Sequence, residues 1–302
     1  MKIKKNKLCL GTVQFGLDYG INNKKGKPSR EESLKMLKKA YNSGINIFDT
    51  ASAYGDAEEI LGEFILKNNL QEKVFIISKL KPNIIKEDCN ILELIESEIK
   101  KSLAKLKINS LYGYLLHTPG DIYNREVVLA LRICKEKGLI KNFGVSIYEE
   151  KDAIYAANLP VDFIQIPYSI FDQRLDKTDF FKITKKNNIK VYARSAFLQG
   201  LFFMNEKDIP DSLKGARLHI KNFNKIIKKY NLIKAQATLL FSYSNKNIDY
   251  VVFGVDNLEQ LTEDLQIVEE NILCKEYLEE IKKNFLNISK SIIFPSLWKK
   301  NE

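Results

Sequence analysis

Four side chains of different chemistry stand at or just beyond the ends of short apolar runs: Asp49, Tyr54, Lys79 and His117. Such a set suits the reduction of a carbonyl group, because adding hydride to C=O creates an alkoxide that must be protonated. We expect Tyr54 to donate that proton. A phenol has a pKa of ~10, and a neighbouring cation lowers that value, so we expect Lys79 to tune Tyr54. Asp49 would hold the lysine, and a neutral His117 would orient the carbonyl oxygen.

Each of these residues also has a purely structural explanation. Asp49 could cap a helix, Tyr54 could anchor a loop, and His117 could sit satisfied in the core. Lys79 could extend its ammonium to solvent. The four together are harder to explain in this way, because Lys79 closes the apolar run Phe75–Ile77 and its ammonium would be at least partly desolvated. A desolvated ammonium is costly without a carboxylate partner, and Asp49 lies on the neighbouring predicted strand.

Eight short apolar or β-branched runs alternate with amphipathic stretches and would position these side chains. Two stretches have helical spacing, 30–43 and 89–106; Ser29 and Glu32 would form a capping box at the start of the first. Strict alternation predicts a parallel sheet, and eight units predict a closed α/β (β/α)8 TIM barrel in a single domain, 1–302, with a C-terminal tail of about 287–302. A doubly wound sheet is the alternative, but residues 11–16 lack the G-x-G-x-x-G spacing. The predicted strands are 8–12, 46–50, 74–79, 112–117, 142–146, 163–167, 190–194 and 250–254.

From residue 8 to about 266 the chain resembles the aldo-keto reductase family. The segment 48–55 is similar to the family's signature, 77–79 and 115–117 to its other catalytic motifs, and 138–146 to a fifth motif. The resemblance implies the barrel fold and an NAD(P)H-dependent oxidoreductase that reduces an aldehyde or ketone. It also implies that the cofactor binds without a Rossmann domain.

The resemblance further implies where the cofactor is held. Ser146 and Gln165 match positions that bind the nicotinamide carboxamide, 195–200 matches the pyrophosphate loop, and 254–260 matches the adenosine-phosphate loop. Arg194 replaces the usual aromatic residue and would either stack on nicotinamide or bind an anionic group of the substrate. The implied cofactor-binding residues are Gly11, Thr12, Asp49, Ser146, Gln165, Arg194, Ser195, Ala196, Phe197, Gly200, Gly254, Asn257 and Gln260.

Two departures affect the expected cofactor contacts. Ile147 stands where the family often has asparagine, which removes one polar contact. Asp256, Asn257 and Gln260 stand where many relatives place Lys or Arg against the 2′-phosphate. The expected cofactor is therefore NADPH, with NADH as the alternative, because an acid near the ribose repels phosphate but can accept a hydroxyl.

Composition excludes several other classes. With 45% hydrophobic and 28% charged residues, the 302-residue chain is globular rather than disordered. The net charge of +10 comes mostly from lysines spaced among glutamates, so a nucleic-acid partner is not expected. The four cysteines form no C-x-x-C pair and the two histidines stand apart, so we expect no metal site. No run reaches the ~18 apolar residues of a membrane span, and we expect a cytoplasmic protein with no membrane partner.

Several questions stay open at this point. The substrate is expected to be a small carbonyl compound, and 195–200 is similar to reductases of bacterial surface-sugar synthesis, which favours a keto-sugar or nucleotide-linked sugar. The alternative to an enzyme is a cofactor-sensing regulatory subunit with little or no turnover. Trp298 would either line the substrate mouth or pack outside the barrel, and the oligomeric state is not determined.

Overall fold

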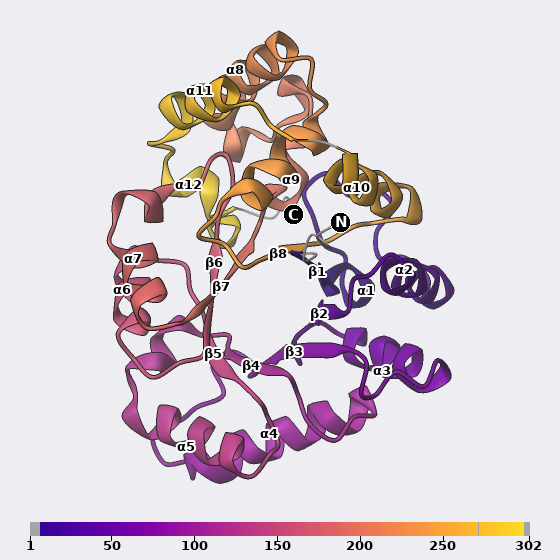
Figure 1. The fold of residues 1–302 in the computed structure, drawn as a ribbon, viewed down its shortest axis with the longest axis vertical. Helices are drawn as coiled ribbons and strands as arrows, with labels where there is room; N and C mark the ends of the chain where they lie inside the picture. Colours follow the sequence, from indigo (N-terminus) through magenta and orange to yellow (C-terminus); the bar gives the residue numbers. More distant parts are fainter. Residues whose placement is uncertain (1–6, 271, 299–302) are drawn as a thin grey trace, which may run out of the picture.

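The computed structural model describes residues 7–270 and 272–298, so parts of the predicted domain and tail (1–6, 271 and 299–302) lie outside the described residues. Eight parallel strands pair in chain order and close into a barrel, which confirms the predicted α/β fold class. Each strand lies within one residue of its predicted bounds (Figure 1). The strands are β1 (Leu8–Gly11), β2 (Ile47–Asp49), β3 (Phe75–Lys79), β4 (Gly113–Leu116), β5 (Phe143–Ser146), β6 (Phe163–Pro167), β7 (Lys190–Arg194) and β8 (Tyr250–Phe253).

Helices surround the barrel and separate the strands along the chain (Figure 1). The α-helices are α1 (Val13–Gly16), α2 (Arg30–Asn42), α3 (Ala57–Lys67), α4 (Ile91–Leu106), α5 (Arg125–Glu136), α6 (Glu150–Ala157), α7 (Phe180–Lys186), α8 (Ala216–Lys229), α9 (Lys234–Ser244), α10 (Leu258–Glu270), α11 (Lys275–Phe285) and α12 (Lys290–Ile293). Short 3₁₀ turns are η1 (Pro119–Tyr123), η2 (Arg174–Lys177), η3 (Leu198–Phe203), η4 (Glu206–Asp208), η5 (Asp211–Leu213) and η6 (Pro295–Leu297).

The predicted helix starts are set by side-chain caps. Ser29 accepts a hydrogen bond from the backbone N–H of Glu32, and the Glu32 carboxylate accepts one from the N–H of Ser29, so the capping box is confirmed. α4 begins at Ile91 rather than Cys89, because Asn90 is its N-cap and accepts from the N–H of Glu93. Both helices therefore begin where a side chain satisfies an otherwise free N–H.

The inward-facing residues of the strands form two layers inside the barrel, one of which makes the site. Seven strands contribute one apolar side chain each to a cluster that plugs the barrel interior: Cys9, Ile47, Ile77, Leu115, Phe163, Tyr192 and Val252. Side chains on a strand repeat every second residue, so the residue two positions later points inward again, one layer nearer the strand's C-terminal end. Those positions are Gly11, Asp49, Lys79, His117, Gln165, Arg194 and Gly254. The alternation thus places a polar layer on top of an apolar plug.

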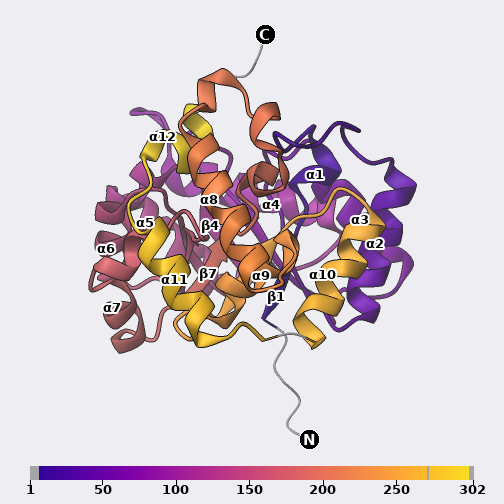
Figure 2. The ribbon, with the colours of Figure 1, turned by 90° about the horizontal axis from the view of Figure 1, so that it is seen from above.

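Two loops cross over this polar layer. The backbone N–H of Ile21, in the loop after α1, donates to the carbonyl of Gln199 in η3 at 2.9 Å. Figure 2 shows both loops at one end of the barrel, opposite to the end where β1 begins. They partly cover the mouth of the barrel and leave a cleft beneath them.

The C-terminal segment packs beside this end of the barrel. Ile292, Ile293 and Phe294 are buried, and the indole N–H of Trp298 donates to the carbonyl of Ile292 at 3.1 Å. The Phe294 ring lies 6.0 Å from the ring of Tyr148. Of the two alternatives for Trp298, the structure favours packing, while Phe294 is the residue through which the segment reaches the cleft wall.

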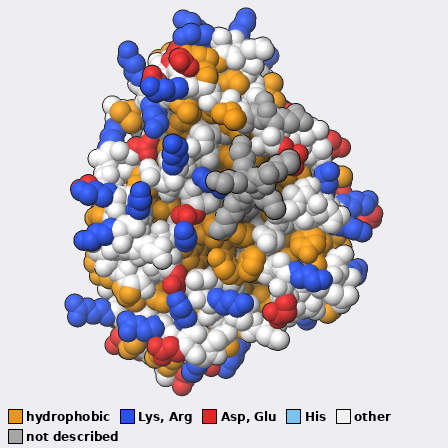
Figure 3. Space-filling view, viewed as in Figure 1, with side chains coloured by type: hydrophobic (Ala, Val, Ile, Leu, Met, Phe, Trp, Pro, Cys, Tyr) orange, Lys and Arg blue, Asp and Glu red, His pale blue; other side chains and the backbone are white. Residues whose placement is uncertain are grey.

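No helix among residues 7–270 and 272–298 is long and apolar enough to cross a bilayer. On the face of the molecule in Figure 3, Lys and Arg side chains are scattered over the outer helices with acidic and uncharged groups between them.

Candidate active site

A buried ion pair forms the base of the site. Lys79, at the end of β3, is 1% exposed, and its ammonium donates to Asp49 Oδ1 at 2.6 Å and to the carbonyl of Thr50 at 2.7 Å. β2 pairs with β3 in a register that sets Asp49 opposite Ile77, so Asp49 lies beside the top of the neighbouring strand. The expected Asp49–Lys79 contact is present, and it pairs two charges that would be costly to bury singly.

Tyr54 and His117 lie together above this pair. Their rings meet edge to face with centroids 5.8 Å apart, and the Lys79 ammonium lies 5.0 Å from the centre of the Tyr54 ring. The structure therefore brings all four predicted catalytic side chains to one end of the barrel.

A close approach of two loop segments fixes the position of Tyr54. A Cβ on Gly16 would lie 1.7 Å from the carbonyl oxygen of Tyr54, and a Cβ on Gly55 would lie 2.3 Å from the carbonyl oxygen of Gly16. Gly55 also has a positive φ of 52°. Only glycine fits at both positions, so the backbone of α1 can press against the loop that carries the phenol.

His117 is held in its neutral form. Burial, with the neighbouring charges of Lys79 and Arg194, lowers its pKa to about 3. Its Nδ1 is buried without a hydrogen-bond partner among the described residues. A neutral imidazole here fits the expected role of orienting a carbonyl oxygen.

In the free protein the pKa of the Tyr54 phenol is raised rather than lowered. Burial of the phenol, and next the charge of Asp49, raise the pKa of Tyr54 above its ordinary value, while Arg194 opposes this rise. Burial is the larger of these causes, and Asp49, which raises the value further, is also the partner of Lys79. Tyr54 is therefore a fully protonated phenol at neutral pH.

A hydrogen-bond network connects the four predicted catalytic side chains to the residues predicted to bind nicotinamide. Gln165 Nε2 donates to Asp49 Oδ2 at 2.8 Å, and Ser146 Oγ donates to Gln165 Oε1 at 3.3 Å. Asp49 thus contacts both Lys79 and Gln165 and couples the two groups of residues. One substitution at Asp49 should disturb both.

Arg194 follows in the same chain of contacts. Its guanidinium donates to the carbonyl of Ile147 at 3.0 Å and to Ser195 Oγ at 3.2 Å, and it lies 4.3 Å from the centre of the Tyr148 ring. The N–H groups of the guanidinium are thus hydrogen-bonded within the protein, and the Tyr148 ring covers one of its two faces. The arrangement favours a fixed planar platform over a mobile cation.

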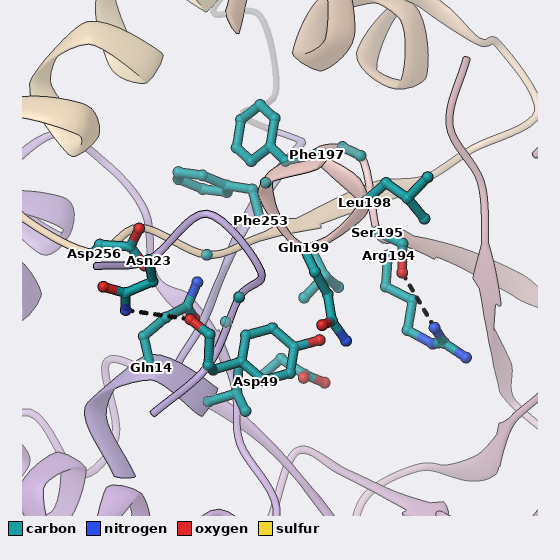
Figure 4. Close-up of a pocket in the computed structure, with 18 of the residues that line it drawn as sticks. Gln14, Asn23, Asp49, Arg194, Ser195, Phe197, Leu198, Gln199, Phe253 and Asp256 are labelled. Carbon is teal, nitrogen blue, oxygen red and sulfur yellow. Dashed lines mark hydrogen bonds between the residues drawn. The ribbon is translucent and has the colours of Figure 1, made fainter. Parts of the chain in front are cut away.

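A cleft of about 360 Å³ runs from these groups beneath the two crossing loops (Figure 4). Among the predicted site residues, Lys79, Thr12 and Asn257 do not line it. Lys79 lies beneath the floor, the Thr12 hydroxyl donates to the carbonyl of Asp49, and Asn257 Oδ1 accepts from the N–H of Gln260 at the start of α10. The lining residues that were predicted are Asp49, Tyr54, His117, Gly11, Ser146, Gln165, Arg194, Ser195, Ala196, Phe197, Gly200, Gly254 and Gln260.

The predicted pyrophosphate loop has an unusual backbone. Ser195, Leu198 and Gln199 have positive φ values of 67°, 45° and 52°, and Gly200 has 89°. Such conformations cost free energy for residues other than glycine and are found where surrounding contacts enforce them, often at ligand sites. Successive turns of this kind also direct backbone N–H groups to one side, which suits an anion.

Sequence reasoning missed part of the lining. Gln14, Tyr19, Asn22, Asn23, Tyr148, Glu263 and Asp264 all line the cleft, but were not assigned to it. Asp264 follows Gln260 by one helical turn, so helical spacing could have found it. Asn22 and Asn23 could not be found in that way, because the path of their loop depends on its contact with Gln199.

Within the described ranges, no group of three or more His, Cys, Asp or Glu side chains could hold a metal ion.

The chain matches a known protein family and several of its members. The Aldo/keto reductase family matches residues 7–284. The aldo-keto reductase YhdN of Bacillus subtilis is 26% identical over 207 residues, which cover 66% of this chain and 60% of YhdN. The uncharacterized oxidoreductase YqkF of the same organism is 24% identical over 301 residues, 91% of this chain and 95% of YqkF.

A solved structure shows the same fold. The holo form of aldo-keto reductase AKR11C1 from Bacillus halodurans superposes with a TM-score of 0.73 at 19% identity, covering 97% of this chain and 95% of that one. The barrel, its polar rim and a family match over nearly the whole length agree, and the chain belongs to the aldo/keto reductase family of NAD(P)H-dependent oxidoreductases.

Proposed function

We propose that this oxidoreductase reduces an aldehyde or ketone to an alcohol, with NAD(P)H bound in the cleft and Tyr54 as the proton donor. One observation carries the proposal: a single cleft contains Tyr54 and His117 together with the left-handed loop 195–200 and the start of α10. A dinucleotide needs such a cleft, because its reactive ring and its adenosine are joined by a long diphosphate.

Polar groups without partners in the free protein fit a bound dinucleotide. Gln14 Oε1 is buried and has no hydrogen-bond partner in the described chain, although Gln14 lines the cleft. Ser146 and Gln165 lie within reach of a carboxamide, and Arg194 offers one face of a planar group beside them. When bound, NAD(P)H supplies the hydride.

The side chains above the ion pair then handle the oxygen of the substrate. A neutral His117 can donate a hydrogen bond to the carbonyl oxygen and so orient it. The protonated Tyr54 phenol can then deliver its proton, because the alkoxide formed on hydride addition is a stronger base than a phenolate. The raised pKa of Tyr54 therefore does not prevent the transfer.

Lys79 and Asp49 act through other groups rather than on the substrate. The ammonium near the Tyr54 ring would stabilise the phenolate left after proton transfer, and Asp49 fixes the ammonium in place. Asp49 also orients Gln165. Both are positioning residues in this proposal.

The test measures oxidation of NADH and NADPH with a panel of aldehydes and ketones. Tyr54→Phe should lower kcat by about 10²-fold or more, the range for a general acid, while cofactor affinity stays near that of the parent protein. Full activity in Tyr54→Phe would overturn the assignment. Tight cofactor binding without turnover on any carbonyl compound would favour the regulatory alternative.

The narrower proposal is a keto-sugar or nucleotide-linked sugar as substrate. Its support is the lining near Tyr54, where two tyrosines, Tyr19 and Tyr148, offer aromatic faces and hydroxyl groups. Values of kcat/KM for keto-sugars, simple aliphatic ketones and aromatic aldehydes decide it. A hydroxyl-free ketone with the highest kcat/KM would refute it.

A further inference from the structure

The end of the cleft remote from Tyr54 has an unusual charge. It is formed by the β8–α10 connection and the first turns of α10, and three carboxyl side chains line it: Asp256, Glu263 and Asp264. Among the cleft-lining residues of the described chain, Arg194 is the only cation, and it stands beside Ser146 near the reaction centre. This end therefore offers acceptors and negative charge but no cation.

Of the three, Asp264 gives the clearest indication of a missing ligand. It is 3% exposed, it lines the cleft, and no hydrogen bond or ion pair of its carboxyl group is found in the described structure. Burial and the neighbouring charge of Glu263 raise its pKa well above the ordinary value. A buried, unpartnered carboxyl group is costly, which points to a ligand that completes it.

Asp256 is held in place next to it. Its backbone N–H donates to Gln260 Oε1 at 2.7 Å, and its carboxyl group accepts hydrogen bonds from the side chains of Gln260 and Gln14. Figure 4 shows Asp256 beside Asn23 and Gln14 at one end of the cleft, with Arg194 at the other. The acid is thus a fixed part of the wall and cannot swing away easily.

We infer that this acidic end selects NADH over NADPH. The inference rests on the proposed function, because a nicotinamide ring beside Tyr54 leaves this end of the cleft for the adenosine half of the cofactor. A phosphate monoester carries a charge of about −1.5 to −2 near neutral pH, and its burial without a paired cation beside carboxylates is unfavourable. The free 2′-hydroxyl of NADH instead donates a hydrogen bond that a carboxylate accepts.

Two lysines near this end of the cleft could supply the missing positive charge. Lys24 and Lys25 directly follow Asn23, but both are exposed and neither lines the cleft. If they turned inward they could pair with a 2′-phosphate. The experiment therefore includes a Lys24→Gln/Lys25→Gln variant.

The test is to titrate the purified full-length protein with NADH and with NADPH in the absence of substrate. Nicotinamide fluorescence or calorimetry measures the dissociation constant of each. We expect NADH to bind about tenfold or more tightly than NADPH. Glu263→Lys reverses an exposed acid at the cleft rim and should strengthen NADPH binding about tenfold with little effect on NADH. Asp264→Asn, which keeps the size of the buried side chain, should change the ratio less than Glu263→Lys does, because burial raises the pKa of Asp264 well above its ordinary value.

Glu269→Lys is the matched control, because it makes the same charge change on the same helix at an exposed position that does not line the cleft. It should leave the ratio of the two dissociation constants unchanged. Equal or tighter binding of NADPH by the parent protein overturns the inference, as does loss of NADPH affinity in the Lys24→Gln/Lys25→Gln variant. If neither dinucleotide binds at millimolar concentration, the proposed function fails together with the inference, whereas a reversed preference overturns only the inference.

Discussion

Replacing Asp49 with asparagine should break the link between Lys79 and Gln165 at the base of the site. The Asp49 carboxylate accepts from the Lys79 ammonium at 2.6 Å and from Gln165 Nε2 at 2.8 Å, and both charged side chains are almost fully buried. Asparagine keeps one acceptor oxygen for Lys79. Its amide nitrogen, however, faces the Gln165 amide, so two donors oppose each other and the negative charge is gone.

The size of the loss follows from burial. Removing one partner of a buried ion pair costs ~3–5 kcal/mol, and we expect about 3 kcal/mol for Asp49→Asn because one acceptor remains. The matched control is Asp56→Asn. Asp56 makes the same kind of contact with Lys27 at 2.7 Å, but both side chains are 37% exposed, so the loss there should stay within ~1 kcal/mol.

The measurement is equilibrium unfolding in urea, combined with steady-state kinetics. A double variant, Asp49→Asn/Lys79→Met, removes the unpaired ammonium as well. It should be more stable than Asp49→Asn alone, while kcat stays low in both. Asp49→Asn leaves the Lys79 ammonium without the carboxylate that fixes it, and the double variant has no ammonium beside the Tyr54 phenolate. If Asp49→Asn unfolds within 1 kcal/mol of the parent protein, as expected for an exposed pair, the buried-pair argument is wrong.

The remaining predictions concern His117 and the barrel wall. Because the pKa of His117 is lowered to about 3 in the folded protein, its stabilising effect is fully present above ~6.5 and is lost as the pH falls towards 3, by about 1.4 kcal/mol per pH unit. Urea unfolding between pH 7 and pH 4 should show a slope that a His117→Gln variant lacks, and NMR should show a neutral ring at pH 5; a ring protonated at pH 6 would contradict this. Gly144→Ala places a Cβ 1.8 Å from the carbonyl oxygen of Phe163 and should lower the free energy of unfolding by about 3 kcal/mol. A Cβ on Gly120 would have no other atom within 4 Å, so Gly120→Ala should change that free energy by less than about 1 kcal/mol. Equal stability of the two alanine variants would contradict the close strand packing.

The sequence by itself determined the strands and the identity of the reactive side chains. Eight apolar runs could be found because a strand buried on both faces has a local signature, and the observed bounds differ from the predicted ones by at most one residue. The residues at the ends of these runs followed from the barrel, since all parallel strands end on the same side. Asp49, Lys79 and His117 were found in this way, each two residues after a side chain of the apolar plug.

Only the tertiary structure decided how these residues behave. The contact between Gln165 and Asp49 joins positions 116 residues apart, and no local pattern encodes it. Burial and the charge of Asp49 raise the pKa of Tyr54 although a lysine lies near its ring. The unpartnered carboxyl of Asp264 and the left-handed turns of 195–200 also depend on which loops meet over the barrel mouth. Hydrophobic periodicity is a property of neighbours along the chain, whereas desolvation and charge pairing depend on neighbours in space.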